Sequence, residues 1–158
     1  MNATKGAQVV TFRLGAEHFA ADILAVERVL RYSTPTVVPR LPDWVEGVLE
    51  HEGRVVPVID LRRRFGLATD AARPENRIII FAVADHWVGA VVDTVHDVAT
   101  FGADQVAPPP PLFRGLPAEY LRGLVRRDGR MLLILEVQRL LTSTETLQLA
   151  QAMEERDG

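Results

Sequence analysis

The chain has 158 residues, of which 47% are hydrophobic and 25% charged, and its formal net charge at pH 7 is −3. This length suffices for one domain with a hydrophobic core, or for two very small ones. The absence of cysteine excludes disulfides, thiolate metal sites and a cysteine nucleophile, and it fits a reducing compartment. The acidic balance gives no general attraction to nucleic acid.

The sequence shows no signal-peptide core near its start and no window of 18 uninterrupted apolar residues, so neither a secretory signal nor a membrane span is expected. Most of the chain predicts short strands, rich in β-branched and aromatic residues and separated by turn signals. The expected strands cover residues 9–14, 18–23, 24–30, 48–50, 55–59, 77–84, 87–95, 119–127 and 130–137. This many strands without βαβ alternation predicts one β-barrel or a pair of small barrels.

Proline and glycine mark special backbone positions. Pro39 and Pro42 before Gly47 predict one short helical turn. Pro57 lies inside an expected strand and predicts a sheet edge or a bulge there, because proline has no N–H to donate. Gly89, also inside a strand, predicts a bulge or a close backbone approach.

The C-terminal segment differs from the rest. Thr142 to Glu145 fit a capping box, and apolar residues follow at helical spacing, so residues 143–155 are expected to form a terminal helix. The polar stretch 68–76 is the expected boundary between two halves of the preceding domain.

No catalytic constellation can be assembled from the sequence. Ser33 and Ser143 are the only serines, and neither lies in a nucleophile elbow; phosphate-binding glycine motifs are also absent. The triplet 50–52, Glu-His-Glu, is the one arrangement that suggests metal binding. Alternation along a strand would turn its histidine away from the two glutamates, so a solvated hairpin tip is the favoured interpretation.

Asp60 ends an apolar strand and is followed by three arginines at 62–64. A cap on the next turn is the favoured role for Asp60, with an ion pair to a nearby arginine as the alternative. The arginines predict a solvated or partner-facing turn, and a single-stranded nucleic-acid patch is the alternative. Trp44 and Trp87 are expected to pack in the core, or else to lie at an interface.

The segment LPDWVEGVLEHEGRVVPVIDLRRRFGL (41–67) resembles the central signature of the CheW family. Residues 9–30, 86–98 and 119–141 resemble other segments of that family, in the same order. The likeness covers about residues 8–142.

The resemblance implies two packed five-stranded SH3-like β-barrels in one domain over residues 8–142, with strands that can be exchanged between them and with 143–158 as helix and tail. It implies a non-enzymatic cytoplasmic adaptor without cofactors. Such an adaptor couples chemoreceptors to a CheA-type histidine kinase at membrane-associated arrays. A regulator that binds a kinase or another partner without receptor coupling, and a nucleic-acid-binding small barrel, are the alternatives.

The resemblance also implies a receptor-binding groove between the barrels, and an amphipathic helix in an apolar groove is a common recognition mode. By position, its residues are Ile23, Val26, Arg28, Val88, Gly89, Val91 and Val95. At Gly89 the lack of a side chain would allow a partner helix to approach the backbone. Structural roles are expected for Trp44, Gly47, Pro57 and Asp60.

One position departs from the family pattern. The family usually has Asn-Leu-Arg-Gly where this chain has Glu50, His51, Glu52 and Gly53. Glu52 thus replaces an arginine that the family uses at its partner interface, and like charges facing each other oppose binding. The sequence therefore predicts a divergent adaptor with its own receptor or kinase.

Overall fold

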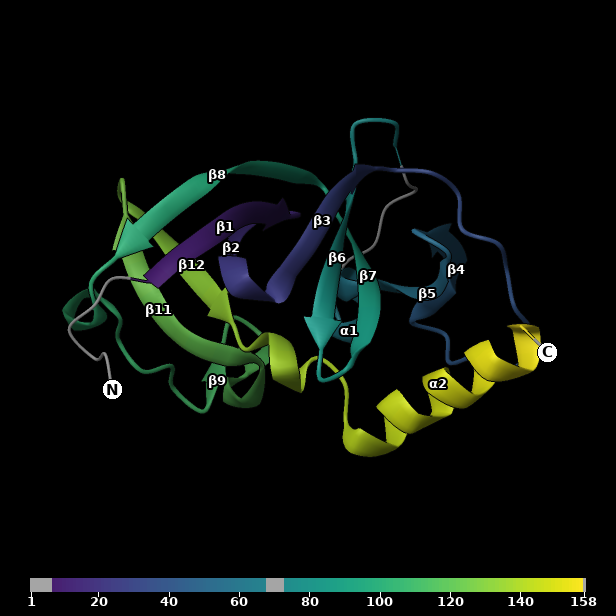
Figure 1. Cartoon of the computed structure of the whole chain (residues 1–158). Coiled ribbons are helices and arrows are strands. Elements are labelled where there is room, and N and C mark those ends of the chain that lie inside the picture. Colours follow the sequence, from purple (N-terminus) through teal and green to yellow (C-terminus); the bar gives the residue numbers. More distant parts are fainter. Residues whose placement is uncertain (1–6, 68–72, 158) are drawn as a thin grey trace.

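The computed structural model describes residues 7–67 and 73–157, in which strands form two five-stranded sheets (Figure 1). The first sheet has the order β11-β12-β2-β1-β8, with β1 (Ala7–Leu14), β2 (Glu17–Asp22), β8 (Thr94–Phe101), β11 (Leu121–Arg127) and β12 (Arg130–Leu135). The second has the order β3-β6-β7-β5-β4, with β3 (Val26–Arg31), β4 (Val45–His51), β5 (Arg54–Asp60), β6 (Arg77–Val83) and β7 (His86–Val92). The prediction of a mainly β fold with two packed five-stranded units is confirmed.

Smaller elements connect and flank the sheets. A two-stranded sheet pairs β9 (Leu112–Phe113) with β10 (Leu116–Pro117). The helical segments are η1 (Ile23–Ala25), α1 (Leu61–Arg64), η2 (Ala103–Gln105), η3 (Ala118–Tyr120), η4 (Val137–Arg139) and α2 (Ser143–Asp157). No helix in the described ranges is long and apolar enough to cross a membrane.

The two sheets do not correspond to successive halves of the chain. The N-terminal hairpin β1–β2 joins β8 and the C-terminal hairpin β11–β12, whereas β3 to β7 make up the second sheet. The expected division near 68–76 therefore differs from the structure, because β6 and β7 follow that segment and pair with strands that precede it. Residues 68–72 themselves lie outside the described ranges. The exchange of strands has a physical consequence, since the two ends of the chain stabilise one sheet together.

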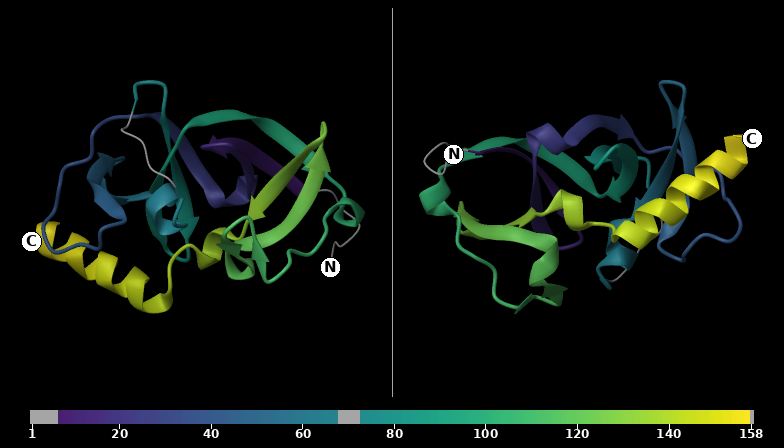
Figure 2. Two further views of the ribbon diagram at one scale, coloured as in Figure 1. Left: turned by 180° about the vertical axis from the view of Figure 1, so that it is seen from behind. Right: turned by 60° about the horizontal axis from the view of Figure 1, so that its bottom comes forward.

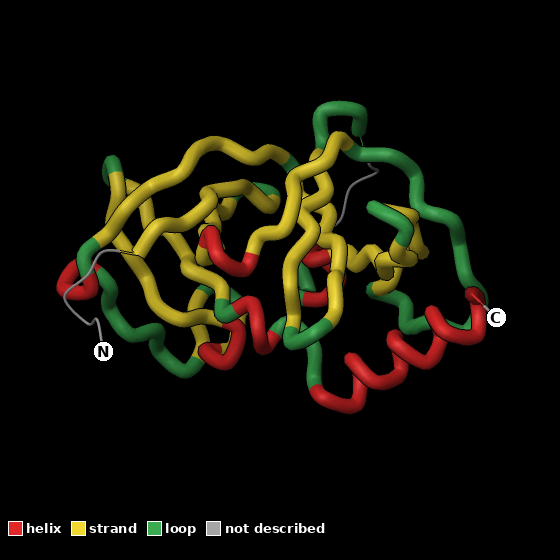
Figure 3. The backbone as a smooth tube through the Cα atoms, viewed as in Figure 1, coloured by secondary structure: helices red, strands yellow, loops and turns green. Residues whose placement is uncertain are grey.

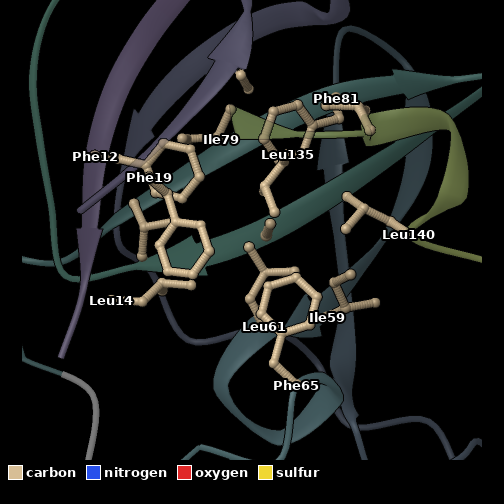
Figure 4. Close-up of a cluster of buried hydrophobic side chains, with 14 of the residues drawn as sticks. Phe12, Leu14, Phe19, Ile59, Leu61, Phe65, Ile79, Phe81, Leu135 and Leu140 are labelled. Atoms are coloured by element: carbon tan, nitrogen blue, oxygen red, sulfur yellow. The ribbon is translucent and has the colours of Figure 1, made fainter. Parts of the chain in front are cut away.

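One hydrophobic core joins the two sheets. Phe12 and Phe19 of the first sheet stack with ring centroids 5.8 Å apart, and Phe19 stacks on Phe65 at 6.0 Å. Ile79 and Phe81 of the second sheet lie in the same buried cluster (Figure 4). A second, smaller cluster fills the first sheet alone and consists of Val9, Ala20, Ala99, Phe101, Val125, Leu132 and Ile134.

The turn expected before Gly47 is not helical: residues 39–40 and 43–44 form turns, and the second is closed by a hydrogen bond of 3.0 Å from the Val45 N–H to the Pro42 carbonyl. Gly47 does not follow a helix but lies inside strand β4. A Cβ atom at Gly47 would lie 2.3 Å from the carbonyl oxygen of Thr36. Thr36 bridges to Val48, with backbone hydrogen bonds of 2.8 and 2.9 Å. Glycine is therefore needed at 47 for the close passage of another backbone, which a turn-based argument does not detect.

Two strand predictions also need correction. Residues 23–25 form the 3-10 turn η1, capped by the Asp22 carboxylate, so the strand expected from 24 begins at Val26. Pro57 is not at a sheet edge, because β5 lies between β4 and β7. Its missing N–H is tolerated since the parallel ladder with β7 begins only at Val58.

The terminal helix is confirmed as α2, which lies along the outside of the second sheet (Figures 1 and 2). The side chains of Leu149 and Met153, both on α2, are buried. The long connection between β3 and β4 runs around the same side of the molecule toward the helix (Figure 3). Together α2 and this connection line an open hollow on that side.

Candidate functional site

The β4–β5 turn presents the position that departs from the family pattern. Glu52 and Gly53 have φ angles of 49° and 75°, so both are left-handed and form the tight turn that suits a hairpin. Glycine adopts this conformation without steric cost, whereas glutamate does so with strain. The Glu52 side chain is held on the surface at the tip of the hairpin.

Arg28 and Glu52 form an ion pair, with the guanidinium nitrogen 3.2 Å from the carboxylate oxygen. The two residues were predicted for partner contacts from separate parts of the sequence, and the fold brings them together. Their side chains are 55% and 53% exposed, so the pair contributes only about 0.2–1 kcal/mol to stability. Its importance is that the charge of Glu52 is compensated within this chain.

An aromatic and cationic cluster lies next to the β4–β5 turn and consists of His51, Arg54 and Trp87. The His51 ring lies 5.6 Å from Trp87, and the Arg54 guanidinium stacks over Trp87 at 3.8 Å. His51 is therefore mostly buried, and the expectation of a fully solvated hairpin tip is wrong for this residue. The structure shows no group of three metal ligands among the residues it describes.

The predicted groove residues fall into two groups. Ile23 on η1, Val26 on β3, Val91 on β7 and Val95 on β8 are half-buried and offer part of their side chains to the surface. Leu24, next to them on η1, is 89% exposed and was not identified from the sequence. The strand expected over residues 24–30 placed Leu24 on one face of a sheet, so its exposure at a turn could not be recognised from the sequence.

Val88 and Gly89 are buried and do not offer a contact surface. Val88 belongs to the main core. A Cβ atom at Gly89 would lie 3.1 Å from Ile78 Cγ2 and 3.4 Å from Val58 Cγ2, so glycine allows neighbouring side chains of the same sheet to pack. The pairing of β7 shows no bulge at Gly89. The expected close approach exists, but it is internal and leaves no room for a partner helix.

Asp60 caps helix α1, as predicted. Its carboxylate accepts hydrogen bonds from the backbone N–H groups of Arg62 and Arg63 at 3.0 and 3.3 Å. The following arginines are not a shared solvated patch. Arg62 pairs with Asp93 in a largely buried contact, and Arg63 alone is exposed, donating to the Asp43 carbonyl at 3.0 Å. This burial removes the basis for a nucleic-acid patch here.

Arg64 links helix α2 to helix α1 through hydrogen bonds and an ion pair. Its two guanidinium nitrogens lie 2.8 and 2.6 Å from the Glu145 carboxylate oxygens, and its Nε donates to the Leu140 carbonyl at 3.0 Å. The guanidinium also lies 4.6 Å from the ring centroid of Trp44. Trp44 packs against the main core, which confirms the core interpretation for this residue. We call the Arg64–Glu145 contact the α2 clasp.

A cavity of about 180 Å³ lies between α2 and strands β5 and β7. Its lining is mainly apolar and includes Val55, Pro57, Trp87, Val88, Leu149 and Met153. Trp87 lines this cavity together with Arg54, whose guanidinium stacks over the indole ring.

Several titratable groups have altered pKa values with identifiable causes. Burial raises the pKa of the Glu46 carboxyl, and the nearby charge of Asp60 adds to this. Hydrogen bonds from Arg127 and then Thr11 lower the pKa of Asp97 to about 2. Asp97 is held in an ion pair with Arg127, and its neighbour His96 forms a hydrogen bond with Thr94.

Comparison with known proteins agrees with this architecture. A family model described as CheW-like domain matches residues 8–145. The chain is 35% identical to the chemotaxis protein CheW of Klebsiella aerogenes, over 90% of this chain and 86% of that protein. It is 32% identical to protein FrzA of Myxococcus xanthus, over 88% and 84% of the two chains.

A solved structure shares the fold as well. The scaffolding protein TtCheW from Thermoanaerobacter tengcongensis aligns with a TM-score of 0.81 and 29% identity, covering 88% of this chain and 90% of that one. The residues of the family match include the strands of both sheets. The chain belongs to the CheW-like domain family.

Proposed function

We propose that this protein is a non-enzymatic adaptor that couples chemoreceptors to a CheA-type histidine kinase in a bacterial chemosensory array. The observation that carries the proposal is the CheW-like domain over residues 8–145, together with its likeness to a protein described as a scaffolding protein. Relatives from several bacteria are named chemotaxis protein CheW. In this role the protein acts in the cytoplasm, where arrays assemble at the membrane.

The receptor surface in this proposal is centred on η1 and the adjoining strands. Ile23, Val26, Val91 and Val95 are half-buried there, and Leu24 adds a nearly free apolar side chain. Apolar side chains that remain partly exposed suit the apolar face of an amphipathic receptor helix. Val88 and Gly89 support this surface from within the sheet.

The kinase contact in this proposal involves the β4–β5 turn with Glu52 and Gly53. A partner that faces Glu52 meets a carboxylate already paired with Arg28 at 3.2 Å. A partner with a complementary cation has to compete with Arg28 for the carboxylate, whereas a partner anion can pair with Arg28. The ion pair thus presents both signs at one place, and its polarity sets which partner charges fit.

Calorimetric titration against the regulatory domain of each CheA-type kinase from the same genome tests the proposal. The variants are Glu52→Arg, Arg28→Glu and the double exchange Arg28→Glu/Glu52→Arg. The double variant restores an ion pair of opposite polarity, so it separates partner recognition from effects on folding. We expect saturable binding to one kinase and weaker binding for the double variant, with unchanged folding by circular dichroism.

Absence of binding to every kinase by the folded wild-type protein would overturn the proposal. Equal binding by wild type and double variant would retain the adaptor and refute the role of Glu52. A titration with a receptor cytoplasmic tip separates the coupling adaptor from a regulator that binds the kinase alone. Only the adaptor binds both, and binding to the kinase without binding to the tip would favour the regulator.

A further inference from the structure

A second surface, remote from the Arg28–Glu52 pair in the fold, has a strong positive charge. It is a hollow of about 600 Å³ at one end of the first sheet. The β1–β2 turn, strand β8, the β11–β12 turn and the loop around Arg114 line it. We call it the basic hollow; its charged and histidine side chains are Arg13, Glu17, His18, His96, Arg114, Arg126 and Arg130.

Arginines outnumber acidic residues in the lining of the basic hollow. The adjoining hollow, which shares His18, His96 and Arg130, also contains Asp97 and Asp128, and both of these are paired with Arg127. Four arginines line the basic hollow against one glutamate, although the chain as a whole has a net charge of −3. That glutamate, Glu17, is already paired with Arg114 at 2.7 Å. Arg13 and Arg126 form no ion pair with any acidic residue in the described part of the chain, and the buried Nε of Arg13 has no hydrogen-bond partner. This arrangement leaves a concentration of guanidinium groups without a counter-charge.

Two histidines complete the centre of the basic hollow. Arg130 lies with a guanidinium nitrogen 3.0 Å from His18 Nε2, and the His18 and His96 rings stack at 6.1 Å. Since arginine only donates, His18 Nε2 accepts from Arg130, which requires a ring without a proton on that nitrogen. Burial lowers the pKa of His18, and the charges of Arg130, His96 and Arg13 lower it further, while Glu17 opposes them.

We propose that the basic hollow is a binding site for a small anion that carries one or two phosphate groups. The guanidinium fork of arginine matches the oxygens of a phosphate, and Arg130 lies beside the imidazole of His18, whose Nε2 becomes a second donor when it takes up a proton. Arg130 contacts His18 at 3.0 Å and the His96 ring stacks on His18 at 6.1 Å, so the three groups are consecutive neighbours, and we place one tetrahedral anion beside them. Arg13 and Arg126 line the same hollow and supply charge for a second phosphate group.

Anion binding at this site is linked to proton uptake. A bound anion compensates the charges of Arg130 and Arg13 and favours the protonated form of His18. The pKa of His18 is therefore higher in the bound state than in the free state, and affinity rises as the pH falls. The expected gain reaches about tenfold per pH unit for each proton taken up.

Proton NMR of the histidine rings in the full-length protein tests the proposal, with sulfate, inorganic phosphate and pyrophosphate as probes at constant ionic strength. Sulfate does not titrate near neutral pH, so a pH dependence of its affinity reports on the protein. We expect saturable shifts at His18 and His96, a rise in the pKa of His18 on binding, and tighter binding of pyrophosphate than of phosphate. Equal affinity for these two would restrict the site to one phosphate group and refute the role of Arg13 and Arg126.

Arg130→Gln is expected to weaken binding by about tenfold or more, because it removes a charged donor. The control is Arg31→Gln, an exposed arginine on β3 in the other sheet. A fold check by circular dichroism accompanies each variant. Absence of saturation by any probe, or an equal loss in the Arg130 and Arg31 variants, would overturn the proposal.

Discussion

The α2 clasp should contribute more to stability than an exposed ion pair does, although Arg64 is one of three consecutive arginines. The Arg64 and Glu145 side chains are 12% and 21% exposed, and they share two short nitrogen–oxygen contacts. An exposed pair contributes about 0.2–1 kcal/mol, whereas removal of one partner from a buried pair costs about 3–5 kcal/mol. With intermediate exposure, we expect Glu145→Gln to lower the free energy of unfolding by about 2–3 kcal/mol.

Urea unfolding of wild type, Arg64→Ala, Glu145→Ala and the double variant measures the clasp directly. We expect a coupling energy of about 1–3 kcal/mol between the two positions. Arg63→Ala is the matched control, since its side chain is 53% exposed on the same helix, and its cost should stay below about 1 kcal/mol. Equal costs for Arg64→Ala and Arg63→Ala, or a coupling energy near zero, would refute the reasoning.

Three further predictions follow from single contacts. Gly47→Ala should destabilise the protein by about 1–3 kcal/mol in urea unfolding, because the new Cβ would lie 2.3 Å from the carbonyl oxygen of Thr36; an unchanged midpoint would contradict the close passage. Asp97 has a pKa of about 2 against an ordinary value of 3.8, so its stabilisation is present above pH 4 and is lost as the pH falls toward 2. Asp97→Asn should therefore flatten the acid side of the stability profile, and an unaltered profile would show that its ion pair is not formed. Arg28→Glu and Glu52→Arg should each shift stability by less than about 1 kcal/mol, and the double exchange should return it toward wild type; a large, unrestored loss would mean that the pair does more than lie on the surface.

The sequence predicted the fold well because most strands carry their own signal. Apolar runs on both sides of the turn at Asp128-Gly129, which is left-handed in the structure, suffice to place the last hairpin. The cap at Asp60 was also predictable, since it depends on backbone groups only two and three residues away. The joining of the N-terminal and C-terminal hairpins in one sheet could not be predicted, because no local pattern records which distant strand completes a sheet.

The candidate sites show the same limit. Glu52 was identified by its departure from the family pattern, but its pairing with Arg28, 24 residues earlier, depends on how β3 and the β4–β5 turn meet. Gly89 was expected to admit a partner, whereas the neighbouring side chains of Ile78 and Val58 occupy the space. Whether a residue on a strand is buried depends on what packs against each face of the sheet. The alternation of residues along one strand does not contain this information.

The basic hollow was not predicted either, because its cations come from strands that are adjacent only in the folded sheet. Arg13 and His18 are paired across β1 and β2, and His18 lies opposite Leu132, next to the turn that carries Arg130. An acidic overall charge conceals such a local excess of arginine. The net charge read from the sequence therefore describes the whole chain and does not reveal a local excess of positive charge at one end of a sheet.

We propose that the protein binds both partners at once. Analytical ultracentrifugation of an equimolar mixture of the protein, the regulatory domain of its cognate CheA-type kinase and a chemoreceptor cytoplasmic tip tests it most directly. We expect a species that contains all three components and is lost when the adaptor is left out. Separate binary complexes that never combine, or no complex with either partner, would contradict it.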